Sequence, residues 1–395
     1  MNQEKYLSKK VQSIKPSGIR KFFDVANMYK DIISLGVGEP DFDTPWNARE
    51  AAVKSIRKGY TQYTANSGLI ELRNKIAEYQ KVRCGLNYDP KDEIFVTVGA
   101  SEAIDLALRA LVDDGDEVIV PDPSYVSYMP CVVMAGGVAV PVRCELKDKF
   151  TLTADNLRKA ITPKSKVLIL PYPNNPTGAI MTKEQLEDIL PIIIENDLVV
   201  ISDEIYSELT YGKEHVSIAS LEGMQERTIL INGFSKAFAM TGWRIGYVCA
   251  PKIFAKAMYK IHQYGIMCAP TASQYCALEA LTSNLNDGFK DVVEMRNQYD
   301  MRRRYLVEEL NDMGLETFEP QGAFYVFPRV SSLGMTGEEF ASELIEKKRV
   351  AVVPGDAFGE SGKDFVRISY AYSIESLKKA MTKIREFVEL KRMKI

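Results

Sequence analysis

The feature that most limits how this chain can fold is a long alternation of apolar runs with helical patterns. From about residue 46, short apolar runs typical of β-strands are separated by segments in which apolar residues recur at helical spacing. The runs at 167–170 and 198–202 are nearly continuous in apolar residues, as strands buried on both faces are. The sequence therefore predicts an α/β fold, with a mostly parallel, mixed sheet flanked by helices.

The C-terminal part of the chain has a different character. Its expected strands and helices are shorter and more mixed in order: strands at 315–318, 323–327, 350–353 and 365–370, and helices at 337–347 and 374–390. Residues 1–45 do not form a domain pattern of their own. We predict a large domain over 46–285 and a smaller α+β domain formed by both termini, 1–45 and 286–395.

Composition excludes several classes of function. The 395 residues are 46% hydrophobic and 26% charged, with a net charge of −3, which gives no basic footprint for nucleic acid or a membrane surface. No apolar run reaches about 18 residues, and the N-terminus has no apolar signal region. The six cysteines show no CxxC spacing. We expect a cytoplasmic protein without a disulfide framework and, with His215 and His262 as its only histidines, without a metal site.

The stretch 232–246 carries the strongest chemical signal. It follows the apolar run 228–231 and contains Lys236 and, eight residues later, Arg244, among small and apolar residues. A partly desolvated lysine is a usable nucleophile, as a Schiff base with an aldehyde cofactor requires. Arg244 could hold a phosphate by a bidentate contact. Taken alone, the stretch could also be a surface loop with an ordinary lysine.

A second signal lies where the predicted strand 93–98 runs into a small-residue turn and a helix. Gly99, Ala100 and Ser101 form this turn. The free N–H groups and the dipole at the start of a helix favour an anion, so the turn could cradle a phosphate. The same turn could also be a simple connection between strand and helix.

Polar residues follow other predicted strands. Asp203 ends the run 198–202, and open α/β sheets bind ligands at the carboxyl ends of their strands. Two amides, Asn174 and Asn175, lie in a loop rich in turn formers. Gly38 follows an N-terminal strand, where it either lets a ligand approach the backbone or forms a plain turn.

These motifs together resemble the class I and II aminotransferases of fold type I, which use pyridoxal 5'-phosphate (PLP). The resemblance covers nearly the whole chain, and its motifs come in the family's order: 36–41, 96–101, 173–178, 202–206, Ser235 and Lys236 with Arg244, and Arg367. Phrases at 16–22, 206–211 and 322–325 are similar to the bacterial aromatic and N-acetyl-diaminopimelate aminotransferases.

The resemblance implies a role for each polar residue around the cofactor ring. Lys236 would bond to the PLP aldehyde and then move a proton between the substrate Cα and the cofactor C4′. Asp203 would pair with the protonated pyridine nitrogen. Tyr206 and Asn175 would hydrogen-bond to the 3′-oxygen. Tyr125 would stack on the ring, although an aromatic residue in a turn can also simply pack.

The resemblance also implies how the phosphate is held. Its ligands would be the turn Gly99, Ala100 and Ser101, the side chains of Ser235 and Arg244, and Tyr63 of a neighbouring subunit. Gly233 stands where many relatives carry a hydroxyl, so this site could lack one hydroxyl or use Ser235 or Ser101 instead. If Tyr63 crosses to a partner, the protein is a homodimer with active sites at the interface.

For the substrate, the resemblance assigns the α-carboxylate to Arg367, with help from Asn175 and the Gly38 N–H. Without that role, a lone arginine in a strand would be an edge-strand charge. The side-chain pocket would draw on apolar and aromatic residues: Ile14, Ile19, Phe22, Phe23, Tyr63 and Tyr125. Such a pocket suits an aromatic or large apolar donor.

The sequence thus predicts transfer of an α-amino group from an L-amino acid to a 2-oxo acid such as 2-oxoglutarate, with ping-pong kinetics. An aspartate or N-acetyl-diaminopimelate donor is an alternative, although one aspartate-specific branch carries a lysine where this chain has Ser101. A β-elimination of the cystathionine β-lyase type would use the same Lys236 and Asp203. A PLP-binding regulatory protein would need a DNA-binding domain, for which residues 1–30 are too short.

Overall fold

A seven-stranded sheet forms the centre of the computed structural model, which describes residues 1, 3–16, 18–19 and 31–393. The strand order is β2-β8-β7-β6-β5-β3-β4. The strands are β2 (Ile94–Thr97), β3 (Glu117–Asp122), β4 (Val138–Arg143), β5 (Ser165–Leu170), β6 (Val199–Asp203), β7 (Thr228–Gly233) and β8 (Gly246–Cys249). The strand β8 runs antiparallel to both of its neighbours, β2 and β7, and the other strand pairs of this sheet are parallel, which confirms the predicted mixed, mostly parallel sheet.

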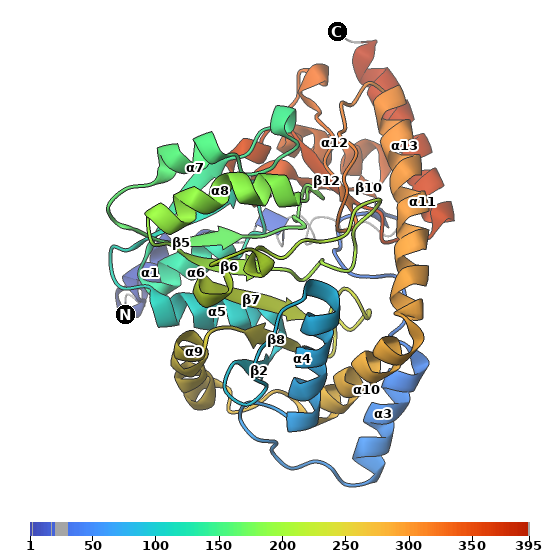
Figure 1. Ribbon diagram of the computed structural model, residues 1–395. Coiled ribbons are helices and arrows are strands. Elements are labelled where there is room, and N and C mark those ends of the chain that lie inside the picture. Colours follow the sequence, from blue (N-terminus) through green and yellow to red (C-terminus); the bar gives the residue numbers. More distant parts are fainter. Residues whose placement is uncertain (2, 17, 20–30, 394–395) are drawn as a thin grey trace.

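Helices cover both faces of this sheet (Figure 1). Side chains alternate between the faces of a strand. Val118 therefore packs with α5 (Gly99–Leu111) and α9 (Lys252–Gly265) on one face, while Ile119 packs with α8 (Lys183–Glu195) on the other. Burial on both faces explains why the strands read as nearly continuous apolar runs.

The other helices lie around this layer or in the C-terminal part. They are α1 (Lys9–Ser13), α3 (Trp46–Arg57), α4 (Ile70–Cys84), α6 (Tyr128–Ala135), α7 (Ala154–Ala160), α10 (Thr271–Asp287), α11 (Lys290–Asp312), α12 (Gly337–Lys348) and α13 (Ile374–Arg392). Within the described ranges, no helix is long and apolar enough to cross a membrane. All six cysteines are free.

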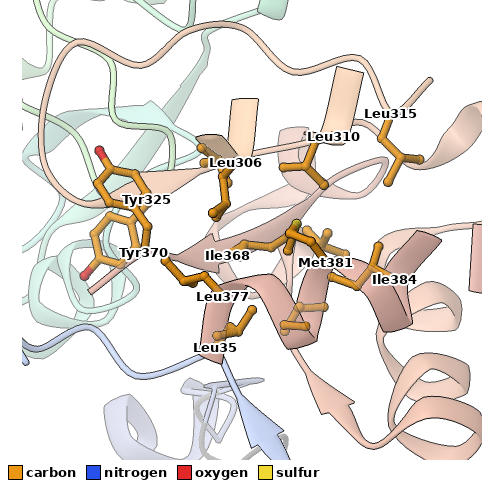
Figure 2. Packing of buried hydrophobic residues seen from close by; sticks show 14 of the residues in the cluster. Leu35, Leu306, Leu310, Leu315, Tyr325, Ile368, Tyr370, Leu377, Met381 and Ile384 are labelled. Carbon is orange, nitrogen blue, oxygen red and sulfur yellow. The ribbon is translucent and has the colours of Figure 1, made fainter. Parts of the chain in front are cut away.

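The N-terminal segment and the C-terminal elements share a separate hydrophobic core. Leu35 packs in one cluster with residues of α11 and α13, and Figure 2 shows it beside Leu377. The strand β1 (Ile33–Ser34) pairs in parallel with β10 (Val350–Ala351). This arrangement agrees with a small domain built from both termini, although the boundaries at 45 and 285 remain predictions.

A small antiparallel sheet completes the C-terminal part, in the order β11 (Val353–Pro354), β12 (Val366–Ser369) and β9 (Tyr325–Val326). The strand predicted at 315–318 is wrong. There the Thr317 backbone N–H donates to the Asn311 side-chain oxygen across 3.0 Å, so a side chain takes the place of a strand partner.

The sheet gathers the predicted functional residues at one edge. Because β3, β5, β6 and β7 are parallel, their carboxyl ends lie together. Tyr125 follows β3, Asn175 follows β5, Asp203 ends β6 and Lys236 follows β7.

Candidate active site

A cavity of about 1680 Å³ lies at this edge, between the sheet and the C-terminal part. It brings together most of the residues predicted from the sequence: Ile14, Ile19, Gly38, Ala100, Ser101, Tyr125, Asn175, Asp203, Tyr206, Ser235, Lys236, Arg244 and Arg367. Gly99 is not itself part of the lining, but the next residue, Ala100, is. Tyr63 does not line this cavity and is 78% exposed. Phe22 and Phe23 lie outside the described residues.

Lys236 reaches the cavity from the turn that follows β7. Its Nζ atom donates a hydrogen bond to the Gly38 carbonyl across 2.6 Å and lies 5.8 Å from the Tyr206 ring centroid. Burial lowers the pKa of Lys236 to about 8, against the opposing negative charge of Glu39. Near neutral pH, this amine is therefore neutral more often than an exposed lysine, and it is the better nucleophile.

Asp203 is a buried carboxylate with two donors. Its Oδ2 atom accepts a hydrogen bond from the Tyr128 hydroxyl at 2.7 Å, and its Oδ1 atom accepts one from the Ile205 N–H at 3.2 Å. Burial raises the pKa of Asp203 to about 6, while these two hydrogen bonds act against that rise. The carboxylate is thus held in place by neighbours and remains free to pair with a cation in the cavity.

The start of α5 and Arg244 form a second polar end of the cavity. Gly99 has a φ of +76°, and a Cβ added there would lie 2.5 Å from Arg244 Nη2, so the guanidinium packs directly against this turn. The first N–H groups of a helix have no partner within it. Together with Ala100, Ser101 and the buried Ser235, they make a site for an anion.

Arg367 lies on β12 across the cavity and is held on several sides. Its Nη1 donates to Asn175 Oδ1 across 2.8 Å, and its Nη2 donates to the Gly36 carbonyl across 2.5 Å. The guanidinium carbon lies 4.5 Å from the Tyr325 ring centroid and 4.7 Å from that of Phe358. The side chain is only 3% exposed, so the guanidinium is presented to a ligand in a fixed orientation.

Sequence reasoning missed Tyr128, Tyr325 and Phe358. Tyr325 belonged to the phrase at 322–325 but received no role, and its hydroxyl lies 2.8 Å from that of Tyr206. Tyr128 follows Tyr125 by three residues, a spacing that a helical turn would place near the same site. Phe358 carried no signal, because its contact with Arg367 depends on the folding of a loop.

Residues 30–384 match the family model for aminotransferases of class I and II. The chain belongs to this family. Among its relatives, a putative aminotransferase, YugH, of Bacillus subtilis (strain 168) is 51% identical over 97% of this chain and 98% of its own length. An aspartate aminotransferase of Pyrococcus abyssi is 46% identical over 98% of this chain and 99% of its own.

A crystal structure gives the same picture for the fold. The aromatic aminotransferase from Pyrococcus horikoshii OT3 is 47% identical, with a TM-score of 0.90 over 94% of this chain and 99% of the other. This aminotransferase therefore has the fold type I architecture. Relatives of nearly equal identity carry the names of aspartate and aromatic enzymes, so similarity alone does not choose the substrate.

Aminotransferases of this family are PLP-dependent, and the residues of the cavity fit this cofactor. An aldehyde requires a lysine with a lowered pKa, which Lys236 has. A phosphate requires an anion site, which Gly99, Arg244 and the start of α5 provide. A protonated ring nitrogen requires a buried carboxylate, and Asp203 is 5% exposed.

Proposed function

We propose that this aminotransferase binds PLP and transfers the α-amino group of an aromatic or large apolar L-amino acid to a 2-oxo acid such as 2-oxoglutarate. Both half-reactions would use one site in ping-pong order. The observation that carries the proposal is that Lys236, Asp203 and Arg367 line one cavity, each from a different segment of the chain.

In this proposal, the polar ends of the cavity hold the cofactor. Arg244, Ser235 and the N–H groups at the start of α5 bind its phosphate. Tyr206 and Asn175 would hydrogen-bond to its 3′-oxygen, and Tyr125 would stack on its ring. Asp203 keeps the ring nitrogen protonated because a buried carboxylate stabilises a positive charge beside it.

The chain's own residues then bind and orient the substrate. Bound PLP supplies an electron-withdrawing ring that stabilises negative charge at the substrate Cα and carries the amino group between the two half-reactions. Arg367 binds the α-carboxylate through two N–H groups, which fixes the orientation of the Cα–H bond. The Lys236 amine would accept the proton of the substrate Cα–H bond and hold it at its Nζ atom, a task suited to a pKa of about 8.

The lining of the cavity favours an apolar donor. The residues that line it include six aliphatic or thioether side chains, which offer no charge to a donor: Ile14, Ile19, Ile104, Val126, Met129 and Val133. A dicarboxylic donor needs a cation for its second carboxylate. With Lys236, Arg244 and Arg367 assigned, the described part of the lining leaves Lys15, which is exposed.

A half-reaction screen tests this proposal. Purified protein loaded with PLP is mixed with single amino acids, and the loss of the cofactor's visible absorbance is followed. We expect phenylalanine, tyrosine and leucine to react faster than aspartate, and 2-oxoglutarate to restore the absorbance. A protein that reacts with no α-amino acid would contradict the proposed activity. Pyruvate and ammonia released without a 2-oxo acid would indicate β-elimination instead.

An aspartate donor is the second candidate, because the Pyrococcus abyssi relative at 46% identity is an aspartate aminotransferase. The same screen separates the two candidates. If aspartate reacts faster than every aromatic amino acid, the apolar-donor assignment is wrong. A Lys15→Ala variant that then lost aspartate but kept other donors would identify the second carboxylate's partner.

We also propose that the enzyme is a homodimer in which Tyr63 reaches the phosphate of the neighbouring subunit. The exposure of Tyr63 supports this proposal, as does the exposure of Tyr264, at 88%. A mixture of inactive Tyr63→Ala and Lys236→Ala subunits should regain activity, because a mixed dimer contains one intact site. Mixing that restores no activity would argue that each site is complete within one chain.

A further inference from the structure

The inference concerns the loop of residues 355–362, which joins β11 to β12. Two short 3₁₀ turns form it, Gly355–Phe358 and Glu360–Gly362. The strand that follows carries Arg367, which is paired with Val353 of β11. Ala357, Phe358, Gly359 and Glu360 all line the cavity. The 355–362 loop is therefore a wall of the substrate site and is connected directly to the strand that holds Arg367.

Asp122, the last residue of β3, holds this loop from the side of the central sheet. Its Oδ2 atom accepts two hydrogen bonds from Ser361, one from the backbone N–H at 3.2 Å and one from the hydroxyl at 2.9 Å. Nearby, the Ser124 N–H donates to the Phe358 carbonyl across 3.0 Å. Because β3 lies between two other strands, it gives the loop a rigid support.

The packing of Gly359 on Asp122 shows how closely the two segments meet. Gly359 has a φ of +132°, and a Cβ added there would lie 1.6 Å from Asp122 Oδ1. Only glycine allows this approach. Among the residues that the structure describes, Oδ1 has no hydrogen-bond partner, although Asp122 is only 5% exposed. A buried oxygen without a partner costs stability, so stability alone does not explain an aspartate here.

The loop acts on the active site through Phe358. This ring is 2% exposed and lies 4.7 Å from the guanidinium carbon of Arg367, while Tyr325 lies 4.5 Å from the same carbon. Arg367 therefore contacts two rings, one from β9 and one from the loop. If Phe358 moved, the guanidinium would lose one of the contacts that orient it toward a carboxylate.

We propose that Asp122 is a positioning residue for substrate binding, whose carboxylate fixes the 355–362 loop and thereby holds Phe358 against Arg367. The proposal rests on the proposed function, because it takes Arg367 as the group that binds the substrate α-carboxylate. Asp122 itself touches neither substrate nor cofactor. Its effect is therefore on the affinity for carboxylates and not on the chemical step.

The test compares Asp122→Ala, Asp122→Asn and Ser361→Ala in the PLP-loaded enzyme. We expect KM for the amino-acid donor to rise about tenfold in Asp122→Ala, with kcat nearly unchanged. The dissociation constant of 3-phenylpropanoate, a carboxylate without an amino group, should rise by a similar factor in calorimetry. Asp122→Asn keeps an acceptor for Ser361 and should recover most of the affinity. The control is Lys363→Ala, an exposed residue just after the loop, which should match wild type.

A second measurement is independent of turnover. Hydrogen exchange in peptides covering 355–362 should be faster in both variants. In Asp122→Ala, the backbone N–H of Ser361 loses its acceptor. In Ser361→Ala, the loop loses the hydroxyl contact that helps to hold it. If Asp122→Ala does not fold, Ser361→Ala removes the hydroxyl hydrogen bond from the loop side and leaves the backbone one, so its effect should be smaller but in the same direction. The double variant should be no worse than the more affected single one.

The outcomes separate the two proposals. Unchanged KM, unchanged 3-phenylpropanoate binding and unchanged exchange in an otherwise active enzyme would overturn the role of Asp122 alone. A fall in both kcat and thermal stability while KM stays unchanged would also overturn it, because that combination indicates a purely structural residue. A wild-type protein that binds neither amino acids nor 3-phenylpropanoate would overturn the proposed function, and the role of Asp122 with it.

Discussion

Tyr128 donates a hydrogen bond to Asp203 across 2.7 Å, and both side chains are buried. Burial raises the pKa of Tyr128 far above its usual value, so the phenol remains a donor. The hydrogen bond stabilises the ionised form of Asp203, whose pKa burial raises to about 6. Tyr128 thus favours the charge state that Asp203 needs in order to hold a protonated ring nitrogen.

Replacing Tyr128 with Phe should weaken PLP binding most at low pH. Without the hydroxyl, the pKa of Asp203 rises further, so the carboxyl becomes protonated at a higher pH and loses its charge. We expect the dissociation constant for PLP to rise about tenfold at pH 6 and less at pH 8. Fluorescence titration of the apoprotein at both values measures this effect.

Tyr88→Phe is the matched control for that experiment. Tyr88 is also a buried tyrosine, but its hydroxyl has no hydrogen-bond partner within the described ranges, and it lies outside the lining of the active-site cavity. The Tyr88→Phe variant should bind PLP with the affinity of wild type at both pH values. Equal affinity in Tyr128→Phe at pH 6 would show that Asp203 does not depend on this hydrogen bond.

The pKa of Lys236 predicts the pH dependence of cofactor capture. Since burial lowers that pKa to about 8, the neutral amine should predominate above pH 8. The rate of PLP capture by the apoprotein, followed by absorbance, should therefore rise with pH and level off near pH 9. Glu39 opposes the lowering, so Glu39→Gln should move the midpoint to lower pH. A rate that still climbs at pH 10 would mean that Lys236 behaves as an exposed lysine.

Arg367→Lys should lose affinity for every α-amino acid. A lysine cannot make the bidentate contact or stack a planar group on Tyr325 and Phe358, so we expect kcat/KM to fall about a hundredfold, or about 3 kcal/mol. Steady-state kinetics with several donors measure this loss. Arg329→Lys, an exposed arginine with a surface ion pair to Glu316, should change little. A loss confined to one donor would point to side-chain recognition instead.

A buried carboxylate, Glu208, predicts a large effect on stability. Glu208 is 3% exposed, and its carboxylate accepts hydrogen bonds from Tyr79 at 2.6 Å and from Arg83 Nε at 2.8 Å. Glu208→Ala leaves the buried Tyr79 hydroxyl without its acceptor and Arg83, whose side chain is 35% exposed, without its ion-pair partner, so we expect the free energy of unfolding in urea to fall by about 2–3 kcal/mol. Glu187→Ala removes an exposed pair on α8 and should cost less than about 1 kcal/mol. Equal losses in the free energy of unfolding for the two substitutions would contradict the expectation that burial makes the Glu208 contacts more stabilising.

Local patterns explain why much of the fold could be predicted. The helix α8 begins at Lys183, where a capping box formed by Thr182 and Gln185 marks a helix start that can be read from neighbouring residues. The apolar run before Asp203 formed β6, which placed this carboxylate at the edge of the sheet. Such signals lie within a few neighbouring residues.

Contacts between distant segments could not be predicted in the same way. The helix α6, which carries Tyr128, has only eight residues, among them Pro130 in its first turn and two β-branched valines, so its sequence gives little helical signal. Asp122 and Ser361 are 239 positions apart, and nothing near either residue indicates the other. The sequence shows a glycine at position 233 where many relatives carry a hydroxyl. The reason for this glycine lies in the pairing of two strands.

Gly233 is opposite Gly246 where β7 pairs with β8. A Cβ added at Gly233 would lie 3.0 Å from the Gly246 Cα and 3.1 Å from the Ile245 carbonyl oxygen, so the strands leave little room for a side chain. A Cβ at Gly246 would in turn lie 2.7 Å from the Ala100 nitrogen, at the turn proposed to bind the phosphate. The two glycines thus let the strands pack close to this turn.

Gly233→Ser should therefore not supply the hydroxyl that the sequence lacks. We expect a loss of about 1–3 kcal/mol in the free energy of unfolding, because the added atoms overpack the strand pair, and no gain in PLP affinity. Ser235→Ala, which removes a hydroxyl that lines the cavity, should instead weaken PLP binding about tenfold with little change in stability. Urea unfolding and fluorescence titration of both variants measure the two effects. Tighter PLP binding by a stable Gly233→Ser protein would show that the strands can open to admit the side chain, and that the phosphate site is short of one donor.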